Sequence, residues 1–427
     1  MLLTTHRMPG LVVRGHQFDL PLTPDDPART IRVFAREVVA PGKEDAALPW
    51  LVYFQGGPGF AAARPMAASG WIGRAVQDYR VLLLDQRGTG LSSPITAQTL
   101  QGLSPQAQAE YLSHFRADAI VRDAEAIRRE LIGDAPWSIL GQSFGGFCAL
   151  HYLSQAPQAL REVFITGGIP PLQRHTDDIY RATYPRVAAK NRLYYQRYPE
   201  DADRVRRIVD HLRVHEVTLP AGGRLSARRF LQLGLGLGMS DGWETLHYLL
   251  EEAFLASARG AEVLSWNFLH HVEQQQSFDT NPIYAVLHEA CYTQGHASAW
   301  SAHRLLAEFP EFGLDEPGPV LFTGEMVYPW MCDDYAQLRP LKECAELLAH
   351  KADWPQLYDA ERLGANTVPV AAAVYYDDMY VHREFSEETA KLMPKVQLWH
   401  TNEYEHNGLR ADGAHILGKL IDRVRGR

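Results

Sequence analysis

The chain contains few cysteines and no long apolar run. Its 427 residues include four cysteines, Cys148, Cys291, Cys332 and Cys344, whose spacing does not fit a metal site. We therefore expect reduced, mostly buried thiols, with no bound metal and no cofactor. No apolar stretch approaches the length of a membrane span, and the first residues lack the apolar core of a signal peptide. These absences predict a cytoplasmic protein that does not bind membranes.

Positive charge is also scarce. The chain has 42 Lys and Arg against 51 Asp and Glu, a formal net charge of −9, and no basic cluster. Nucleic acids and anionic membranes attract clustered positive charge, so we expect neither as a partner. The apolar content of 46% supports a sizeable core, and the length exceeds that of a usual single domain. One core domain with a large insertion is therefore expected.

The most informative stretch is the hexapeptide Gly141-Gln142-Ser143-Phe144-Gly145-Gly146. It follows the apolar run 137–140 and precedes the apolar run 147–153, an order that predicts a strand, a sharp turn and a helix. The glycines remove Cβ atoms that would clash across so tight a turn. The serine at its apex would be offered to a base, and the helix would aim backbone N–H groups at a developing oxyanion.

Two upstream segments repeat the pattern of a buried strand followed by a glycine-rich loop. Residues 51–55 run into Gly56-Gly57-Pro58-Gly59, and residues 81–85 run into the loop 86–92. This repetition predicts a parallel sheet with its functional loops at the carboxyl ends of the strands. Further elements are expected as an antiparallel hairpin (11–20 and 29–40), a helix (105–131) and strands near 162–167, 368–376 and 396–400.

The middle of the chain has a different pattern. From about residue 172 to about residue 356 it is mostly helical, with many aromatic residues and few strand signals. The strand pattern then resumes. The simplest interpretation is a core domain of residues 1–171 and 357–427, interrupted by a helical cap of residues 172–356.

The motifs QGGPG, DQRGTGLSSP and GQSFGG, in this order and spacing, resemble the α/β-hydrolase fold. Within that fold they are similar to the proline iminopeptidases (prolyl aminopeptidases), whose usual signatures are HGGPG, D-x-R-G-x-G-x-S and G-x-S-x-G-G. The resemblance covers residues 30–170 and 365–415, and the chain looks like the longer type. It implies a mostly parallel central sheet flanked by helices, with a large, mainly helical cap. Gln55 stands where the family pattern usually has histidine.

The fold's chain order of serine, acid and histidine places the remaining catalytic residues in the returning core. Asp378 matches the family's strand ending, so it is predicted as the catalytic acid, with Asp377 as the alternative. His406 matches the family's histidine position in the loop between the last strand and the last helix. By contrast, His400 still belongs to the strand and His415 to the final helix.

The resemblance implies a role for each of these residues. Ser143 is the expected nucleophile, His406 the general base and acid, and Asp378 the group that orients the imidazole. The expected oxyanion donors are the backbone N–H groups of Gly57 and Phe144. Chemistry of the dehalogenase or epoxide hydrolase kind would need an aspartate in place of the serine.

Specificity is expected to come from the cap. The amine of an N-terminal proline is a cyclic secondary ammonium, which carboxylates and apolar or aromatic walls would suit. Family members use glutamates of the cap for this purpose. Glu289 and Glu325 lie among apolar and aromatic residues and are the substrate-binding candidates; the alternative is a solvated helix residue or a structural ion pair. Asp85 and Arg87 are expected to organise their loop.

The resemblance therefore implies a serine exopeptidase that releases N-terminal proline from short peptides through an acyl-enzyme. The alternative is an esterase, amidase or broader aminopeptidase that uses the same three residues. A non-enzymatic binding protein on this scaffold is disfavoured, because serine, acid and histidine all occur in the expected order. The sequence indicates neither the oligomeric state nor the preferred leaving group.

Overall fold

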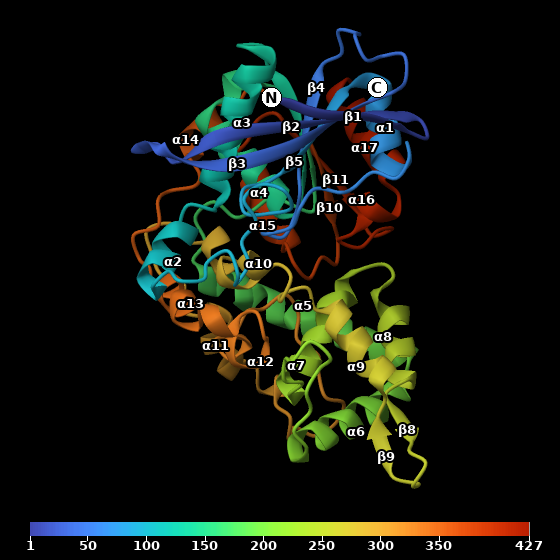
Figure 1. The fold of residues 1–427 in the computed structure, drawn as a ribbon. Helices are drawn as coiled ribbons and strands as arrows, with labels where there is room; N and C mark the ends of the chain where they lie inside the picture. The colour runs from blue at the N-terminus through green and yellow to red at the C-terminus, as the bar shows by residue number, and fades with distance from the viewer. Residues whose placement is uncertain (427) are drawn as a thin grey trace.

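A nine-stranded sheet forms the centre of the protein (Figure 1). The computed structural model describes residues 1–426. The strand order is β1-β2-β3-β5-β4-β6-β7-β10-β11, antiparallel from β1 to β5 and parallel from β5 to β11. The strands are β1 (Leu2–Met8), β2 (Leu11–Thr23), β3 (Asp26–Val39), β4 (Trp50–Phe54), β5 (Arg80–Asp85), β6 (Trp137–Gln142), β7 (Leu160–Thr166), β10 (Val370–Tyr375) and β11 (Val396–Thr401).

The parallel strands are buried on both faces, as their continuous apolar runs require. Along β4, Leu51 and Tyr53 pack into one core cluster, and Val52 and Phe54 pack into the other. Helices cover both faces (Figure 1): α1 (Gly70–Asp78) and α17 (Gly413–Val424) on one side, and α3 (Ala117–Ile132), α4 (Phe144–Gln155) and α14 (Ala360–Gly364) on the other. The predicted α/β-hydrolase fold is confirmed.

Between β7 and β10 the chain leaves the sheet and builds a mainly helical lobe (Figure 1). Its helices are α5 (Thr176–Arg197), α6 (Asp201–Val214), α7 (Ala227–Leu231), the 3₁₀ helix η2 (Gln232–Gly238), α8 (Gly242–Glu251), α9 (Trp266–Gln275), α10 (Pro282–Val286), α11 (Ser301–Leu305), α12 (Met331–Asp334) and α13 (Lys342–Ala349). We call this lobe the cap. The domain limits at residues 171 and 356 stay a prediction.

Three elements differ from the sequence-based expectation. The helix predicted over 105–131 is two helices, α2 (Pro105–Leu112) and α3. Between them, Arg116 has an extended backbone, and its guanidinium donates to the carbonyls of Thr293 and Pro355, each at 2.9 Å. Contacts with the cap therefore interrupt a stretch of high helix propensity. Strand β1 and the cap hairpin β8 (Phe254–Ala256)–β9 (Glu262–Leu264) were not predicted.

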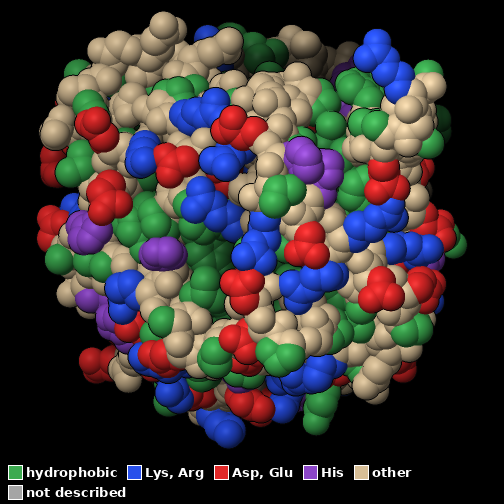
Figure 2. All heavy atoms as spheres, turned by 90° about the horizontal axis from the view of Figure 1, so that it is seen from below, with side chains coloured by type: hydrophobic (Ala, Val, Ile, Leu, Met, Phe, Trp, Pro, Cys, Tyr) green, Lys and Arg blue, Asp and Glu red, His purple; other side chains and the backbone are tan. Residues whose placement is uncertain are grey.

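The surface and the cysteines fit the sequence analysis. At the cap end of the molecule, acidic and basic side chains are interspersed (Figure 2), and ion pairs such as Arg181–Glu308 at 2.8 Å join them. All four cysteines lie buried as free thiols. Among residues 1–426, no helix is both long and apolar enough to cross a bilayer, and no cluster of three potential metal ligands occurs.

Candidate active site

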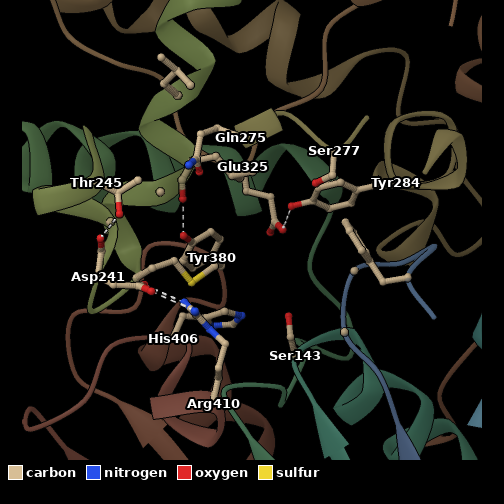
Figure 3. Close-up of a pocket in the computed structure, with 18 of the residues that line it drawn as sticks. Ser143, Asp241, Thr245, Gln275, Ser277, Tyr284, Glu325, Tyr380, His406 and Arg410 are labelled. Atoms are coloured by element: carbon tan, nitrogen blue, oxygen red, sulfur yellow. Dashed lines mark hydrogen bonds and ion pairs between the residues drawn. The ribbon is translucent and has the colours of Figure 1, made fainter. Parts of the chain in front are cut away.

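Ser143 stands on a sharp turn between β6 and α4. Its φ of +53° lies in the left-handed region that side chains other than glycine rarely adopt. Its N–H donates to the carbonyl of Thr166 on the neighbouring strand at 2.9 Å. A Cβ on Gly145 would collide with the Phe54 carbonyl, and one on Gly141 with the Gly145 carbonyl, so only glycine fits either position. The turn thus holds the Ser143 hydroxyl out into a cavity (Figure 3).

The structure brings Asp378, and not Asp377, to the imidazole of His406. The Asp378 Oδ2 lies 2.7 Å from His406 Nδ1, and Oδ1 accepts from the N–H groups of Tyr380 at 2.8 Å and Val381 at 3.0 Å. The neighbouring Asp377 is half-exposed and pairs with an arginine of α5 at 3.2 Å. These contacts fix the Asp378 carboxylate in one orientation at the end of β10.

The environment of His406 suits an imidazole that must accept a proton. Burial alone would lower its pKa, but the carboxylate of Asp378, together with those of Glu325 and Glu405, outweighs this effect, so the pKa lies above its ordinary value. Because Asp378 occupies Nδ1, the other ring nitrogen, Nε2, is left for the cavity. The ring of Tyr380 packs on the imidazole with a centroid distance of 4.4 Å.

The cap holds the loop that carries His406. The N–H of His406 donates to the carbonyl of Gly238 in η2 at 3.2 Å. Arg410, four residues further on, donates to both oxygens of Asp241, at 2.9 and 2.7 Å (Figure 3). The Glu405 carboxylate lies 2.5 Å from the amine of a buried lysine in α5. Bonds from several parts of the cap therefore converge on this loop.

A cavity of about 540 Å³ separates the core from the cap at this point. Ser143 and His406 face it from the core side, and Glu325 and Tyr284 face it from the cap side (Figure 3). The predicted nucleophile, histidine and one of the two predicted glutamates thus meet in one cavity. Further lining residues include Gln55, Gly57, Phe60, Gln142, Leu233, Leu235, Met239, Leu246, Gln275 and Tyr380.

The two predicted oxyanion donors lie on the backbone beside Ser143. Gly57 lines the cavity, and a Cβ on its neighbour Gly56 would meet the Ser143 side chain, so this loop lies against the serine. Phe144 is the first residue of α4, and its N–H has no acceptor within the helix. The catalytic role of these two N–H groups stays a prediction.

Glu325 is a carboxylate without a fixed cation. The Tyr284 hydroxyl donates to its Oε1 at 2.6 Å, and His288 Nε2 lies 3.9 Å from its Oε2. Burial lowers the pKa of His288, which favours the neutral ring. Within residues 1–426, no lysine or arginine pairs with Glu325, although its side chain is only 15% exposed. A largely buried anion of this kind is stabilised by a cationic ligand.

Glu289 does not reach this cavity. Its two oxygens accept from the N–H groups of Ser301 at 3.1 Å and Ala302 at 3.0 Å, which open the first turn of α11. Burial raises the pKa of Glu289, while these hydrogen bonds act in the opposite direction. The structure therefore argues against the substrate-binding role that the sequence suggested. The apolar neighbours of Glu289 in the sequence indicated a buried carboxylate, but its hydrogen-bond partners lie twelve and thirteen residues further along the chain.

Asp85 and Arg87 have structural partners, as expected. Both Asp85 oxygens accept from the guanidinium of Arg64, at 2.6 and 2.7 Å. Arg87 is almost fully buried and donates to both oxygens of Asp123, at 2.8 and 2.6 Å. These pairs fix the loop after β5 and leave neither charge free for chemistry.

Sequence reasoning expected apolar or aromatic walls but did not identify the residues that form them. The rings of Phe60 and Tyr284 meet edge to face at a centroid distance of 5.0 Å and line the cavity beside Glu325. Phe60 directly follows the glycine-proline loop, and this position could have indicated it. Tyr284 lies in the cap, 141 residues after Ser143, and no local signal pointed to it. Gln55 accepts from the Tyr53 hydroxyl at 3.1 Å and also lines the cavity.

The chain is similar to several known proteins. A family profile described as "alpha/beta hydrolase fold" matches residues 49–220. A proline iminopeptidase of Aeromonas sobria is 52% identical over 415 residues, which cover 96% of each chain. The proline iminopeptidase aneH of Aspergillus aculeatus is 38% identical, over 95% of this chain and 92% of its own. The solved structure of a Mycobacterium smegmatis proline iminopeptidase covers 96% of this chain and 98% of its own, at 13% identity and a TM-score of 0.45. The chain belongs to the proline iminopeptidase family, in its longer form, and carries the α/β-hydrolase fold.

Proposed function

We propose that this protein is a serine exopeptidase that releases N-terminal proline from peptides. The observation that carries the proposal is the position of Glu325: a carboxylate that no lysine or arginine of residues 1–426 pairs with faces Ser143 across one cavity, beside aromatic walls. An exopeptidase of this kind needs an anion at a fixed distance from its nucleophile, because the free amine lies one residue from the scissile carbonyl. Relatives with the name proline iminopeptidase at 52% and 38% identity support the same activity.

The proposed substrate fits the acyl side of the cavity. The secondary ammonium of proline has two N–H donors, and Glu325 offers charge-assisted acceptors for them. The Tyr284 hydroxyl donates to the same carboxylate and holds it in place. The rings of Phe60 and Tyr284 provide apolar surface for the pyrrolidine ring. Because Glu289 is bound to the start of α11, we assign the amine to Glu325 alone.

The catalytic residues perform acyl transfer in two halves. The Ser143 oxygen attacks the proline carbonyl while His406 Nε2 takes the hydroxyl proton, and Asp378 stabilises the resulting imidazolium. The N–H groups of Gly57 and Phe144 stabilise the oxyanion. The carbon–nitrogen bond then breaks, and the leaving nitrogen takes its proton from His406. A water molecule, deprotonated by the same imidazole, then attacks the ester carbonyl. The bond to the Ser143 oxygen breaks, this oxygen takes the proton back from His406, and proline is released.

The test compares three amides with the purified protein. Prolinamide should be hydrolysed, alaninamide more slowly, and N-acetylprolinamide poorly, because the acetyl group removes the charge that Glu325 binds. Replacing Ser143 by alanine should reduce kcat by a factor of about 10⁴ or more without unfolding the protein. Equal rates on free and acetylated prolinamide would instead favour a general esterase or amidase that uses the same residues.

The cellular context is part of the proposal. Four buried, free thiols are typical of a reducing compartment and support a cytoplasmic location. The interspersed surface charges support short peptides, rather than nucleic acids or membranes, as the partners. We assign residues 172–356 to a cap domain that supplies the amine site, and residues 1–171 and 357–427 to the catalytic core.

A further inference from the structure

A second cavity, also of about 540 Å³, adjoins the first. It lies between the segment of residues 63–72 and α16 (Gly408–Ala411). Five residues line both cavities, namely Gln55, Gln142, Met239, His406 and Arg410. Ser143, Gly57 and Glu325 line only the first. The second cavity therefore adjoins the first at the imidazole, away from Glu325.

The proton transfer to the leaving nitrogen determines which part of the substrate lies near the second cavity. When the carbon–nitrogen bond breaks, the leaving nitrogen must lie against Nε2 of His406 to receive its proton. The proline half of the substrate is then held between Ser143 and Glu325, on the other side of the scissile bond. The peptide that follows proline extends from the leaving nitrogen. Both cavities adjoin the imidazole, but only the second lies clear of Ser143, Gly57 and Glu325, which hold the proline half.

We propose that the second cavity binds the leaving peptide and prefers an apolar side chain in the residue that follows proline. This inference rests on the proposed function. It assigns the cavity to the product amine, whereas the first cavity receives the acyl group.

Apolar side chains make up a large part of the second cavity's lining, and no lysine, aspartate or glutamate lines it among residues 1–426. Pro65, Met66, Trp71 and Ile72 supply one side, and Leu409 supplies the other. The two arginines on its wall are each paired with a carboxylate through two hydrogen bonds: Arg64 with Asp85 at 2.6 and 2.7 Å, and Arg410 with Asp241 at 2.9 and 2.7 Å. An apolar side chain gains free energy on entering such a space, whereas a charged one loses hydration without finding a partner.

Two amides stand where the cavities meet. Gln55 and Gln142 line both, so their side chains lie beside the path of the peptide backbone. A carboxamide can donate to a peptide carbonyl and accept from a peptide N–H. Gln55 occupies the position at which related sequences usually have histidine. A hydrogen bond from its amide to the peptide backbone would give the glutamine a role at this position.

The test measures kcat/KM of the full-length protein on prolinamide, Pro-Gly-NH₂, Pro-Leu-NH₂ and Pro-Lys-NH₂. Prolinamide releases only ammonia and does not reach the second cavity. Full burial of a leucine side chain corresponds to a factor of about 10 to 100, so Pro-Leu-NH₂ should exceed Pro-Gly-NH₂ by about that much. Equal values for the leucine and glycine substrates would overturn the inference.

A charge placed on the cavity rim gives a second readout. Met66 lines the cavity and is 84% exposed, so Met66→Glu leaves the core packing intact. It should shift the ratio of Pro-Lys-NH₂ to Pro-Leu-NH₂ about two- to fivefold toward lysine, the range of an exposed ion pair. Leu392→Glu is the matched control, because Leu392 is also exposed and lines neither cavity.

Within-enzyme ratios are unaffected by the folded fraction of a variant. The same shift in both variants would show that the charge acts at long range, and it would overturn the assignment of the cavity. Failure of the proposed function has a different signature: prolinamide and every prolyl peptide would remain uncleaved while simple esters were hydrolysed.

Discussion

Replacing Glu325 with glutamine removes the charge that faces the bound amine at nearly constant volume. The Tyr284 hydroxyl, 2.6 Å from Oε1, can still donate to the oxygen of the new amide, so the cavity keeps its shape. A hydrogen bond to a charged group contributes about 1.5–3 kcal/mol. At 1.36 kcal/mol for each factor of ten, kcat/KM for prolinamide should fall by a factor of about 10 to 150.

The assay compares prolinamide with a simple ester that has no amine. The ester depends on Ser143, His406 and the oxyanion donors but not on Glu325, so its kcat/KM should change little. Glu289→Gln is the matched control, because the two glutamates looked alike in the sequence and differ in their contacts. It places an NH₂ group against the N–H donors of α11 and should cost about 1–3 kcal/mol of stability, measured by urea denaturation.

The two variants should therefore differ in which property they lose, activity or stability. Glu325→Gln should lose activity on the amine substrate at normal stability, and Glu289→Gln should lose stability at a normal kcat/KM per folded molecule. Full retention of prolinamide turnover in Glu325→Gln would refute the assignment of the amine to this carboxylate. A parallel loss on the ester would show that the substitution had damaged the catalytic residues instead.

Other predictions follow from the contacts around the imidazole and in the core. Asp378→Asn should reduce kcat by a factor of about 10⁴, whereas Asp377→Asn should leave it nearly unchanged, and the reverse ranking would move the acid to Asp377. The pKa of His406 is raised and only the neutral imidazole can accept the serine proton, so a pH profile of kcat/KM should rise with pH through a pKa above the ordinary histidine value; an acid limb at or below that value would contradict the pairing. Arg87→Met leaves Asp123 buried without its partner and should cost about 3–5 kcal/mol in urea denaturation, with ester turnover by the remaining folded protein unaffected.

Much of the catalytic core could be predicted from sequence because its information is local. Strand β6, the turn with Ser143 and helix α4 follow one another directly along the chain. Steric limits at Gly141 and Gly145 permit few other residues in this turn. The position of Asp378 at a strand end and of His406 in the following loop depends on the topology of the sheet, which the motifs had already indicated.

The cap was harder to predict because its contacts are between distant residues. Glu289 and Glu325 have similar apolar neighbours in sequence, and only the fold shows that one binds the start of α11 and the other faces the cavity. The break between α2 and α3 has the same cause, since Arg116 is bound by carbonyls more than 170 residues away. Helix propensity contains no information about the contacts of the two glutamates or of Arg116, because it describes each residue without its distant neighbours.

The bonds between the cap and the His406 loop have a consequence for how specificity can evolve. The Gly238 carbonyl and the Asp241 carboxylate belong to the lobe that we propose selects the substrate, yet they hold the loop of the proposed general base. An isolated core would retain its nucleophile on a rigid turn but lose the anchors of its proton acceptor. Substrate selectivity and catalytic rate therefore depend on the same contacts. A displacement of the cap would also release the loop that positions His406. A substitution that changes the shape of the cap should alter kcat together with KM.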